Sequence, residues 1–309
     1  MTVEPTIEPT VDQLSKSFNV PGQVKVVEGK GGFPVVTVTN EKATAKISVY
    51  SAQVLSFQPV GESADLMFVS EQAYYKTGKA TKGGIPICWP WFGPDPEGKG
   101  RASHGFVRNR MWTLLSAEPL PTGETKVRLG MLPSEETLGI WPYPFELVME
   151  VLVGNTLTVT LTTKNTGDQT FPITQAFHTY FATGDINQVK VLGLEGVTYL
   201  DKVNSGEVTA QEGAISFSGE VDRVYMGVKP ELVVDDGAMG RRIRITSTGS
   251  KTAIVWNPWS EISEKMADLE SQDYQRFVCV ETANAGDEVI QVAPGEEYQL
   301  KAVYAIERG

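Results

Sequence analysis

The sequence predicts an all-β protein, a large antiparallel β-sandwich with one or two short helices. Apolar and polar residues alternate with a period of two along most of the chain, which is typical of strands with one buried face. Helical patterns are scarce, and the lack of strand–helix alternation argues against a doubly wound parallel sheet. A single all-β domain can reach 309 residues, and so many strands usually pack as a sandwich or barrel.

The first clear strand is expected at residues 43–49. Ala43, Ala45, Ile47 and Val49 alternate there with polar or exposed positions, so one face of the strand is buried.

The strongest local prediction is a hairpin within FELVMEVLVGNTLTVTLTTKNTG, residues 145–167. Alternating apolar residues stand on both sides of Gly154-Asn155, a dipeptide that favours a two-residue loop.

The remaining elements are predicted from weaker sequence patterns. Residues 241–256 are expected to form a second hairpin, and residues 298–307 a last strand after the turn APGEE. Short helices are expected at residues 260–271, with Ser260 as N-cap, and at residues 11–18. The latter lies in an N-terminal arm, residues 1–20, that precedes a single domain at residues 21–309.

The charge distribution limits the possible partners. A net charge of −11 argues against nucleic acid and against anionic membranes. Residues 76–110 nevertheless hold seven basic and two acidic residues, a local charge of +5. This island suggests a small anionic ligand, and chance clustering on a solvated loop is the alternative.

Cysteine usage and the first residues indicate a soluble cytoplasmic protein. Cys88 and Cys279 are far apart and have no metal-ligand spacing, so two reduced, partly buried thiols are expected, with a disulfide between them as the alternative. The N-terminal stretch is polar and acidic, without the apolar segment of a secretion signal, and no window approaches a membrane span.

Two neighbouring segments contain candidate binding residues. KGGIPICWPWFGP, residues 82–94, is either a rigid plug at one end of the core or an aromatic pocket wall against which a sugar could stack. SHGFVRNR follows at residues 103–110. If residues 106–110 are extended, Phe106, Arg108 and Arg110 point the same way, and an arginine there could bind phosphate or carboxylate or could form a surface salt bridge.

Two strands contain candidate acid–base residues. In QAFHTYF, residues 175–181, Ala176, His178 and Tyr180 share one face; a lone strand histidine is more often structural than catalytic. In FVCVETAN, residues 277–284, Glu281 interrupts an apolar strand and shares one face with Phe277 and Cys279, opposite Val278, Val280 and Thr282. Burial would raise its pKa and suit it to act as a base, unless it reaches solvent at the strand end. Asp222, taken alone, indicates an ordinary surface pair with Arg223.

Six segments in this order resemble the hexose-6-phosphate mutarotase branch of the aldose 1-epimerase family. The resemblance implies a galactose mutarotase-like β-sandwich that interconverts the α and β anomers of glucose 6-phosphate or a related hexose 6-phosphate, without cofactor or metal. The segments are KGGIPICWPWFGP, SHGFVR, QAFHTYF, VDRVY, WNPW and VCVETAN.

The resemblance also implies residue roles. Glu281 would take the proton of the C1 hydroxyl and His178 would protonate the ring oxygen, so that the ring opens, rotates about C1–C2 and recloses. Asp222 would bind sugar hydroxyls, His104 would line the pocket, and Arg108 matches the family arginine after HGF.

Two positions differ from the family pattern. Lys82 replaces an arginine and Ser103 a glutamine, so phosphate would lose a bidentate contact. An epimerase of neutral aldoses and a non-catalytic carbohydrate-binding protein are therefore the alternative functions. A monomer is expected, with a small sugar phosphate as its partner.

Overall fold

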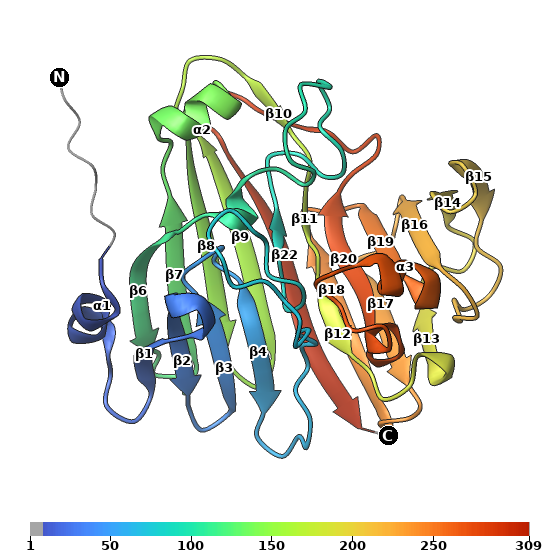
Figure 1. Ribbon diagram of the computed structural model, residues 1–309, viewed down its shortest axis with the longest axis horizontal. Coiled ribbons are helices and arrows are strands. Elements are labelled where there is room, and N and C mark those ends of the chain that lie inside the picture. Colours follow the sequence, from blue (N-terminus) through green and yellow to red (C-terminus); the bar gives the residue numbers. More distant parts are fainter. Residues whose placement is uncertain (1–8, 309) are drawn as a thin grey trace.

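A computed structural model of the chain, which describes residues 9–308, confirms the all-β prediction. Two eight-stranded sheets and a four-stranded sheet, all antiparallel, form the body of the molecule (Figure 1). A small two-stranded sheet pairs β10 (Phe171–Ile173) with β21 (Ile290–Val292).

The first eight-stranded sheet, here called the back sheet, contains the predicted central hairpin and the last strand. Its strands are, in spatial order, β13 (Val189–Leu192), β17 (Glu231–Asp236), β18 (Arg241–Thr248), β22 (Glu297–Arg308), β9 (Leu157–Asn165), β8 (Phe145–Val153), β7 (Thr125–Met131) and β6 (Thr113–Pro119).

The second, here called the front sheet, contains the two strands that carry the candidate acid and base. Its strands are, in spatial order, β15 (Glu207–Ala210), β14 (Thr198–Asp201), β16 (Val221–Met226), β19 (Thr252–Asn257), β20 (Phe277–Asn284), β11 (Gln175–Phe177) and β5 (Ile87–Cys88), and β12 (Tyr180–Ala182) also pairs with β20.

The four-stranded sheet comes from the N-terminal part of the chain and lies in front of β6 to β9 in Figure 1. It confirms the strand expected at residues 43–49. Its strands are β1 (Val24–Glu28), β2 (Pro34–Thr39), β3 (Ala43–Ser48) and β4 (Val54–Pro59).

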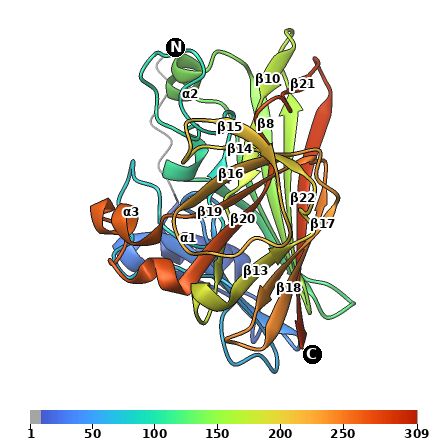
Figure 2. The same cartoon turned by 90° about the vertical axis from the view of Figure 1, so that its right-hand side faces the viewer.

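One hydrophobic core lies between the back sheet and the other two sheets. It takes Val278 and Val280 from β20, Leu161 from β9 and Ala302 from β22. A hydrogen bond between the hydroxyls of Thr179 and Tyr304, 2.8 Å long, joins the two large sheets across it. In Figure 2 the strands β16, β19 and β20 lie on one side and β17, β18 and β22 on the other.

Helices are few, as predicted. Helix α1 (Val11–Phe18) has the expected bounds, because Thr10 and Gln13 form a capping box at its start. Its Leu14 belongs to the main core, whereas residues 1–8 of the expected arm lie outside the described residues. Helix α2 (Glu135–Ile140), capped by Ser134, was not predicted. The part of the chain that the structure describes also contains four short 3-10 helices, η1 (Lys30–Gly32), η2 (Val107–Asn109), η3 (Ile186–Gln188) and η4 (Asp273–Arg276).

Three local predictions were wrong. Helix α3 (Trp259–Lys265) is shorter than expected and begins after Pro258 rather than after Ser260. The hairpin of β8 and β9 has a three-residue loop, since Val153 pairs with Leu157. Residues 241–256 form no hairpin, because β18 belongs to the back sheet and β19 to the front sheet, so this segment crosses between layers.

No helix among residues 9–308 combines the length and the apolar character that a membrane crossing needs.

Candidate active site

The candidate site lies on the outer face of the front sheet, away from the core. All eight residues of β20 are buried, yet they divide between two faces. Val278 and Val280 point into the main core, whereas Phe277 and Cys279 pack in a separate cluster on the other face. Glu281 shares this outer face by the strand's period of two, as the sequence predicts.

His178 lies opposite Glu281 on the neighbouring strands. Ala176 pairs with Ala283, and Tyr180 pairs with Cys279, so one continuous register places His178 beside Glu281. The expected strand at residues 175–181 is divided at His178 and Thr179 into β11 and β12. The amide of His178 donates a hydrogen bond to the carbonyl of Pro86, 2.9 Å away, rather than to β20.

The two side chains form a close pair in a nearly dry environment. Nε2 of His178 is 3.5 Å from Oε1 of Glu281, and the side chains are 12% and 1% exposed. Burial raises the pKa of Glu281 well above its ordinary value, and Lys202 and Arg108 oppose this rise. Burial lowers the pKa of His178 well below its ordinary value, assisted by His104 and Arg108. Both pKa shifts favour the uncharged pair, in which the imidazole is neutral and the carboxyl group is protonated.

A tight turn places His104 beside His178. Gly105 has φ +74°, and a Cβ there would lie 1.8 Å from the carbonyl oxygen of Trp89, so only glycine fits. His104 itself has φ +64°. The amide of Gly93 donates to its Nδ1 over 3.3 Å, which leaves the neutral ring with its proton on Nε2. Burial lowers the pKa of His104 to about 3.

Only two cations of the predicted basic island reach the cavity, Lys82 and Arg108. Residues 107–109 form η2 rather than the expected extended segment. Arg110 therefore points elsewhere and pairs with Glu136, 2.8 Å away. Near Asp95, Lys99 and Arg101 pair with local carboxylates.

Lys82 and Arg108 are held differently. Nζ of Lys82 lies 3.5 Å from Oδ2 of Asp268, on the segment that follows α3. Nη2 of Arg108 donates to the carbonyl of Ser103 over 3.1 Å. Ser103 itself is exposed and does not line the cavity, so its observed contact comes from its backbone.

The opposite rim carries Asp222 and a third cation that the sequence analysis missed. Nζ of Lys202 is 3.5 Å from Oδ1 of Asp222 and 5.2 Å from the centre of the Phe92 ring. Lys202 begins a turn that Asp201 fixes by accepting the amides of Val203 and Asn204. This role of Asp201 is the signal that could have located Lys202, since Asp commonly organises such turns.

These groups enclose a cavity of about 240 Å³ with polar and aromatic walls. Six of the seven candidate residues line it, Ser103 being the exception. The KGGIPICWPWFGP segment fills both of its alternative roles, because Trp89 is fully buried in the core while Phe92 lines the cavity. The lining residues are Lys82, Phe92, His104, Arg108, His178, Tyr180, Lys202, Asp222, Ile254, Trp256, Met266 and Glu281.

The cavity also contains unsatisfied polar atoms. Among residues 9–308, Nδ1 of His178 and Oε2 of Glu281 are buried without a hydrogen-bond partner. A buried polar atom without a partner costs about 1–3 kcal/mol, so a polar ligand that satisfies Oε2 would bind with that advantage.

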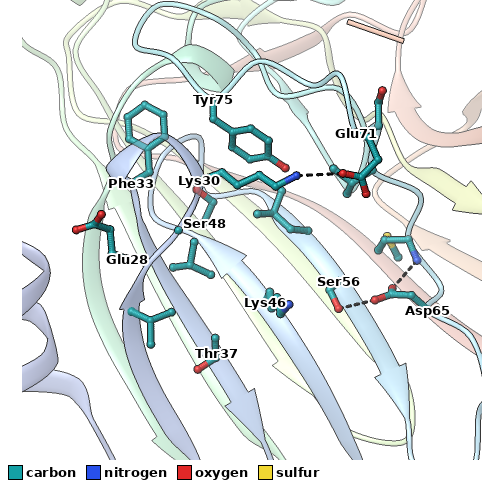
Figure 3. Close-up of a pocket in the computed structure, with 17 residues that line it drawn as sticks. Glu28, Lys30, Phe33, Thr37, Lys46, Ser48, Ser56, Asp65, Glu71 and Tyr75 are labelled. Atoms are coloured by element: carbon teal, nitrogen blue, oxygen red, sulfur yellow. Dashed lines mark hydrogen bonds and ion pairs between the residues drawn. The ribbon is translucent and has the colours of Figure 1, made fainter. Parts of the chain in front are cut away.

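A larger groove on the outer face of the four-stranded sheet has a different character. It has a volume of about 500 Å³ and is shown in Figure 3. Lys30 pairs there with Glu71 over 3.3 Å, and Asp65 accepts hydrogen bonds from Ser56 and from the amide of Met67. Its lining includes neither histidine, so the groove lacks the acid–base pair of the smaller cavity.

Both thiols are free, as expected, and they are fully buried rather than partly buried. Cys88 and Cys279 contribute to the outer-face clusters beneath the cavity. Burial raises the pKa of Cys88 to about 12, so this thiol is not a nucleophile near neutral pH.

The fold is that of the galactose mutarotase-like proteins. A solved structure of a galactose mutarotase-like protein from Clostridium acetobutylicum aligns with a TM-score of 0.73, covering 93% of this chain and 98% of its own, at 14% identity.

Closer relatives define the family. The model of the aldose 1-epimerase family matches residues 34–305. A Cenchrus ciliaris protein named "Putative glucose-6-phosphate 1-epimerase" is 37% identical over 264 residues, 82% of this chain and 79% of its own. A crystal structure from Salmonella typhimurium, described as "a putative mutarotase", aligns with a TM-score of 0.88 at 30% identity, covering 94% of this chain and 96% of that one. The chain therefore belongs to the aldose 1-epimerase family.

Proposed function

We propose that this protein is a hexose-6-phosphate mutarotase, which interconverts the α and β anomers of glucose 6-phosphate or a related hexose 6-phosphate. The observation that carries the proposal is the His178–Glu281 pair, 3.5 Å apart in a small cavity with three cations among its lining residues. The name of the Cenchrus ciliaris relative supports the same substrate class.

The pair supplies both proton transfers that ring opening needs. Glu281 accepts the proton of the C1 hydroxyl, and His178 donates a proton to the ring oxygen as the C1–O5 bond breaks. The open-chain aldehyde rotates about C1–C2, and the reverse transfers close the ring on the other face. One proton belongs to the pair throughout: it is on His178 before opening and on Glu281 after it.

The environment of the pair favours the product of these transfers and makes the imidazolium–carboxylate pair the less stable, more reactive state. Opening converts an imidazolium and a carboxylate into an imidazole and a carboxylic acid. Burial raises the pKa of Glu281 and lowers the pKa of His178, which stabilises this uncharged product state. A carboxylate with a raised pKa is also a stronger base, and an imidazolium with a lowered pKa is a stronger acid.

The remaining groups suit a phosphorylated sugar. Arg108 and Lys82 supply positive charge for the phosphate, with Arg108 offering a planar donor fork. Asp222 supplies an acceptor for sugar hydroxyls. Trp256 and Phe92 supply aromatic surface for the apolar C–H face of the ring.

The test is the rate at which freshly dissolved α-glucose 6-phosphate reaches anomeric equilibrium, followed by polarimetry beside α-glucose. We expect the protein to accelerate the phosphate preferentially, with spontaneous anomerisation as the blank and the Glu281→Gln variant, purified identically, as the contamination control. Acceleration of glucose alone would favour a neutral aldose 1-epimerase. Acceleration of neither sugar would contradict the proposal and favour a binding role.

A further inference from the structure

No other residue among residues 9–308 gives the imidazole of His178 a hydrogen bond of ordinary geometry. Its Nδ1 is buried without a partner. Its Nε2 is 3.5 Å from Oε1 of Glu281, beyond the roughly 2.7–3.2 Å of an ordinary N–H···O bond. Catalytic histidines are usually oriented by an acceptor on the second ring nitrogen. Another contact therefore has to fix this ring.

Tyr180 provides that contact. Its ring lies nearly parallel to the imidazole of His178, with centroids 4.9 Å apart and planes 10° from parallel. Trp256 meets the edge of both rings, at 5.8 Å from His178 and 6.0 Å from Tyr180. Rotation of the imidazole about Cβ–Cγ out of this plane would break the flat contact, so the stack fixes the plane of the ring. The approach of Nε2 to Oε1 of Glu281 selects between the two ring flips within that plane.

Tyr180 is itself immobilised. Its amide donates to the carbonyl of Gly84 over 2.9 Å, and its backbone pairs with Cys279. Its ring packs on Phe277, with centroids 5.2 Å apart, in a buried cluster that includes Phe68 and Leu269. Tyr180 is only 4% exposed, so it is a rigid support rather than a mobile surface residue.

We propose that Tyr180 is a positioning residue that acts through His178: its stacked ring fixes the plane of the imidazole, in which Nε2 faces Glu281, and supports the imidazolium with its π face. The catalytic part rests on the proposed function, since it takes His178 as the acid. The orientation of the ring does not depend on that assignment.

The charges around His178 show why a π face matters. Burial, His104, Arg108 and Lys82 all oppose protonation of His178. Glu281 from β20 is the one carboxylate within ion-pair distance of it among residues 9–308. The face of an aromatic ring attracts a cation. The Tyr180 ring therefore joins Glu281 in favouring the imidazolium that donates the proton.

The test compares Tyr180→Phe, which keeps the ring, with Tyr180→Leu, which removes it. Tyr50→Leu is the matched control, because Tyr50 is equally buried and stacks on Phe33 at 4.1 Å and 10°, outside the cavity. The chain has two histidines, so the imidazole of His178 can be titrated by NMR in each protein.

We expect Tyr180→Phe to keep kcat within about threefold. Tyr180→Leu should lower kcat by at least about tenfold with KM changed less than about twofold, because the acid is misplaced while binding groups remain. It should also lower the pKa of His178. Tyr50→Leu should reduce thermal stability without changing kcat or the His178 titration.

A Tyr180→Leu variant with normal kcat and an unchanged His178 titration would overturn the proposal. So would a Tyr180→Phe variant as impaired as the leucine variant, since the hydroxyl would then be responsible. If the leucine variant does not fold, the NMR spectrum of the wild type tests the stack. Stacking requires upfield ring-current shifts of the His178 ring protons, and their absence overturns the proposal. If the wild type lacks mutarotase activity but the leucine variant still alters the His178 titration, the proposed function fails and the ring's positioning stands.

Discussion

Nζ of Lys202 lies 3.5 Å from Oδ1 of Asp222, and this pair has a counterpart across the cavity in Lys82 and Asp268, also 3.5 Å apart. Two of the three cations that line the cavity are thus already matched by carboxylates. Arg108 is the one that forms no ion pair within residues 9–308. An incoming phosphate therefore meets its least compensated positive charge at Arg108.

This arrangement predicts that Arg108 dominates the preference for phosphorylated sugars. Arg108→Met should lower the ratio of kcat/KM for glucose 6-phosphate to that for glucose by about 10- to 100-fold, the usual effect of removing a hydrogen bond to a charged group. Lys82→Met should lower it less. Arg110→Met is the control, because Arg110 lies outside the cavity lining and pairs with Glu136. An unchanged ratio in Arg108→Met would place the phosphate elsewhere.

His178→Ala should separate binding from turnover. We expect kcat to fall by about 10²–10⁴-fold, the usual contribution of a general acid, while glucose 6-phosphate still binds. Calorimetric titration measures the binding of glucose 6-phosphate, and the anomerisation rate measures turnover, both on the same preparation. Undiminished anomerisation would remove His178 as the acid.

Glu281→Gln should lose activity by a similar factor, with little change in affinity. We also expect it to be more stable than the wild type at pH 8 by about 1–3 kcal/mol, since the uncharged amide avoids the cost of burying a carboxylate or of keeping it protonated above its ordinary pKa. Activity equal to the wild type would remove Glu281 as the base.

The sign of the stability difference follows from the raised pKa of Glu281. Above its ordinary pKa, the unfolded state has lost a proton that the folded state keeps, so wild-type stability falls as pH rises. The gap between the variants should therefore widen from pH 5 to pH 8 in urea denaturation. A gap that narrows over this range would contradict a raised pKa.

The pH dependence of kcat should be bell-shaped. The active pair carries one proton. Because the pKa of His178 is lowered, addition of a second proton should occur below about pH 6.5, and because the pKa of Glu281 is raised, loss of the last proton should occur above about pH 4.5. His104, with a pKa of about 3, should not contribute near neutrality.

The substrate's own phosphate titrates near pH 6, so the profile should also be measured with glucose, which carries no phosphate. A rate that rises steadily with hydroxide concentration from pH 5 to pH 9 would contradict paired acid–base catalysis.

Gly105→Ala should be among the most destabilising single substitutions in the chain. The added Cβ would overlap the carbonyl of Trp89, and the residue has φ +74°. We expect a loss of about 3–5 kcal/mol or failure to fold, as for other severe backbone clashes. Gly98→Ala is the control, since its φ is +65° but a Cβ there meets nothing within 4 Å. Equal stability of the two variants would contradict the close approach.

The sequence predicted the candidate site best on the strands of His178 and Glu281, where the alternation of residues also decides which side chains face the cavity. The faces of residues 175–181 and 277–284 were correctly predicted, because a period of two decides which side chains share a face. It could not show that residues 241–256 cross between sheets, since both strands are apolar enough for either partner. Its only signal for Lys202 was the turn that Asp201 organises, and it had none for the pairing of Lys82 with Asp268, which depends on α3 ending at Lys265.

The position of the cavity outside the sandwich has an evolutionary consequence. The three cations that line the cavity, Lys82, Arg108 and Lys202, come from separate connections between strands, whereas the core uses the opposite faces of the strands. Substitutions at these three positions change no residue of the main core. A library that randomises them should keep most members folded while sampling new sugars, so substrate range in this scaffold can drift without a matching loss of stability.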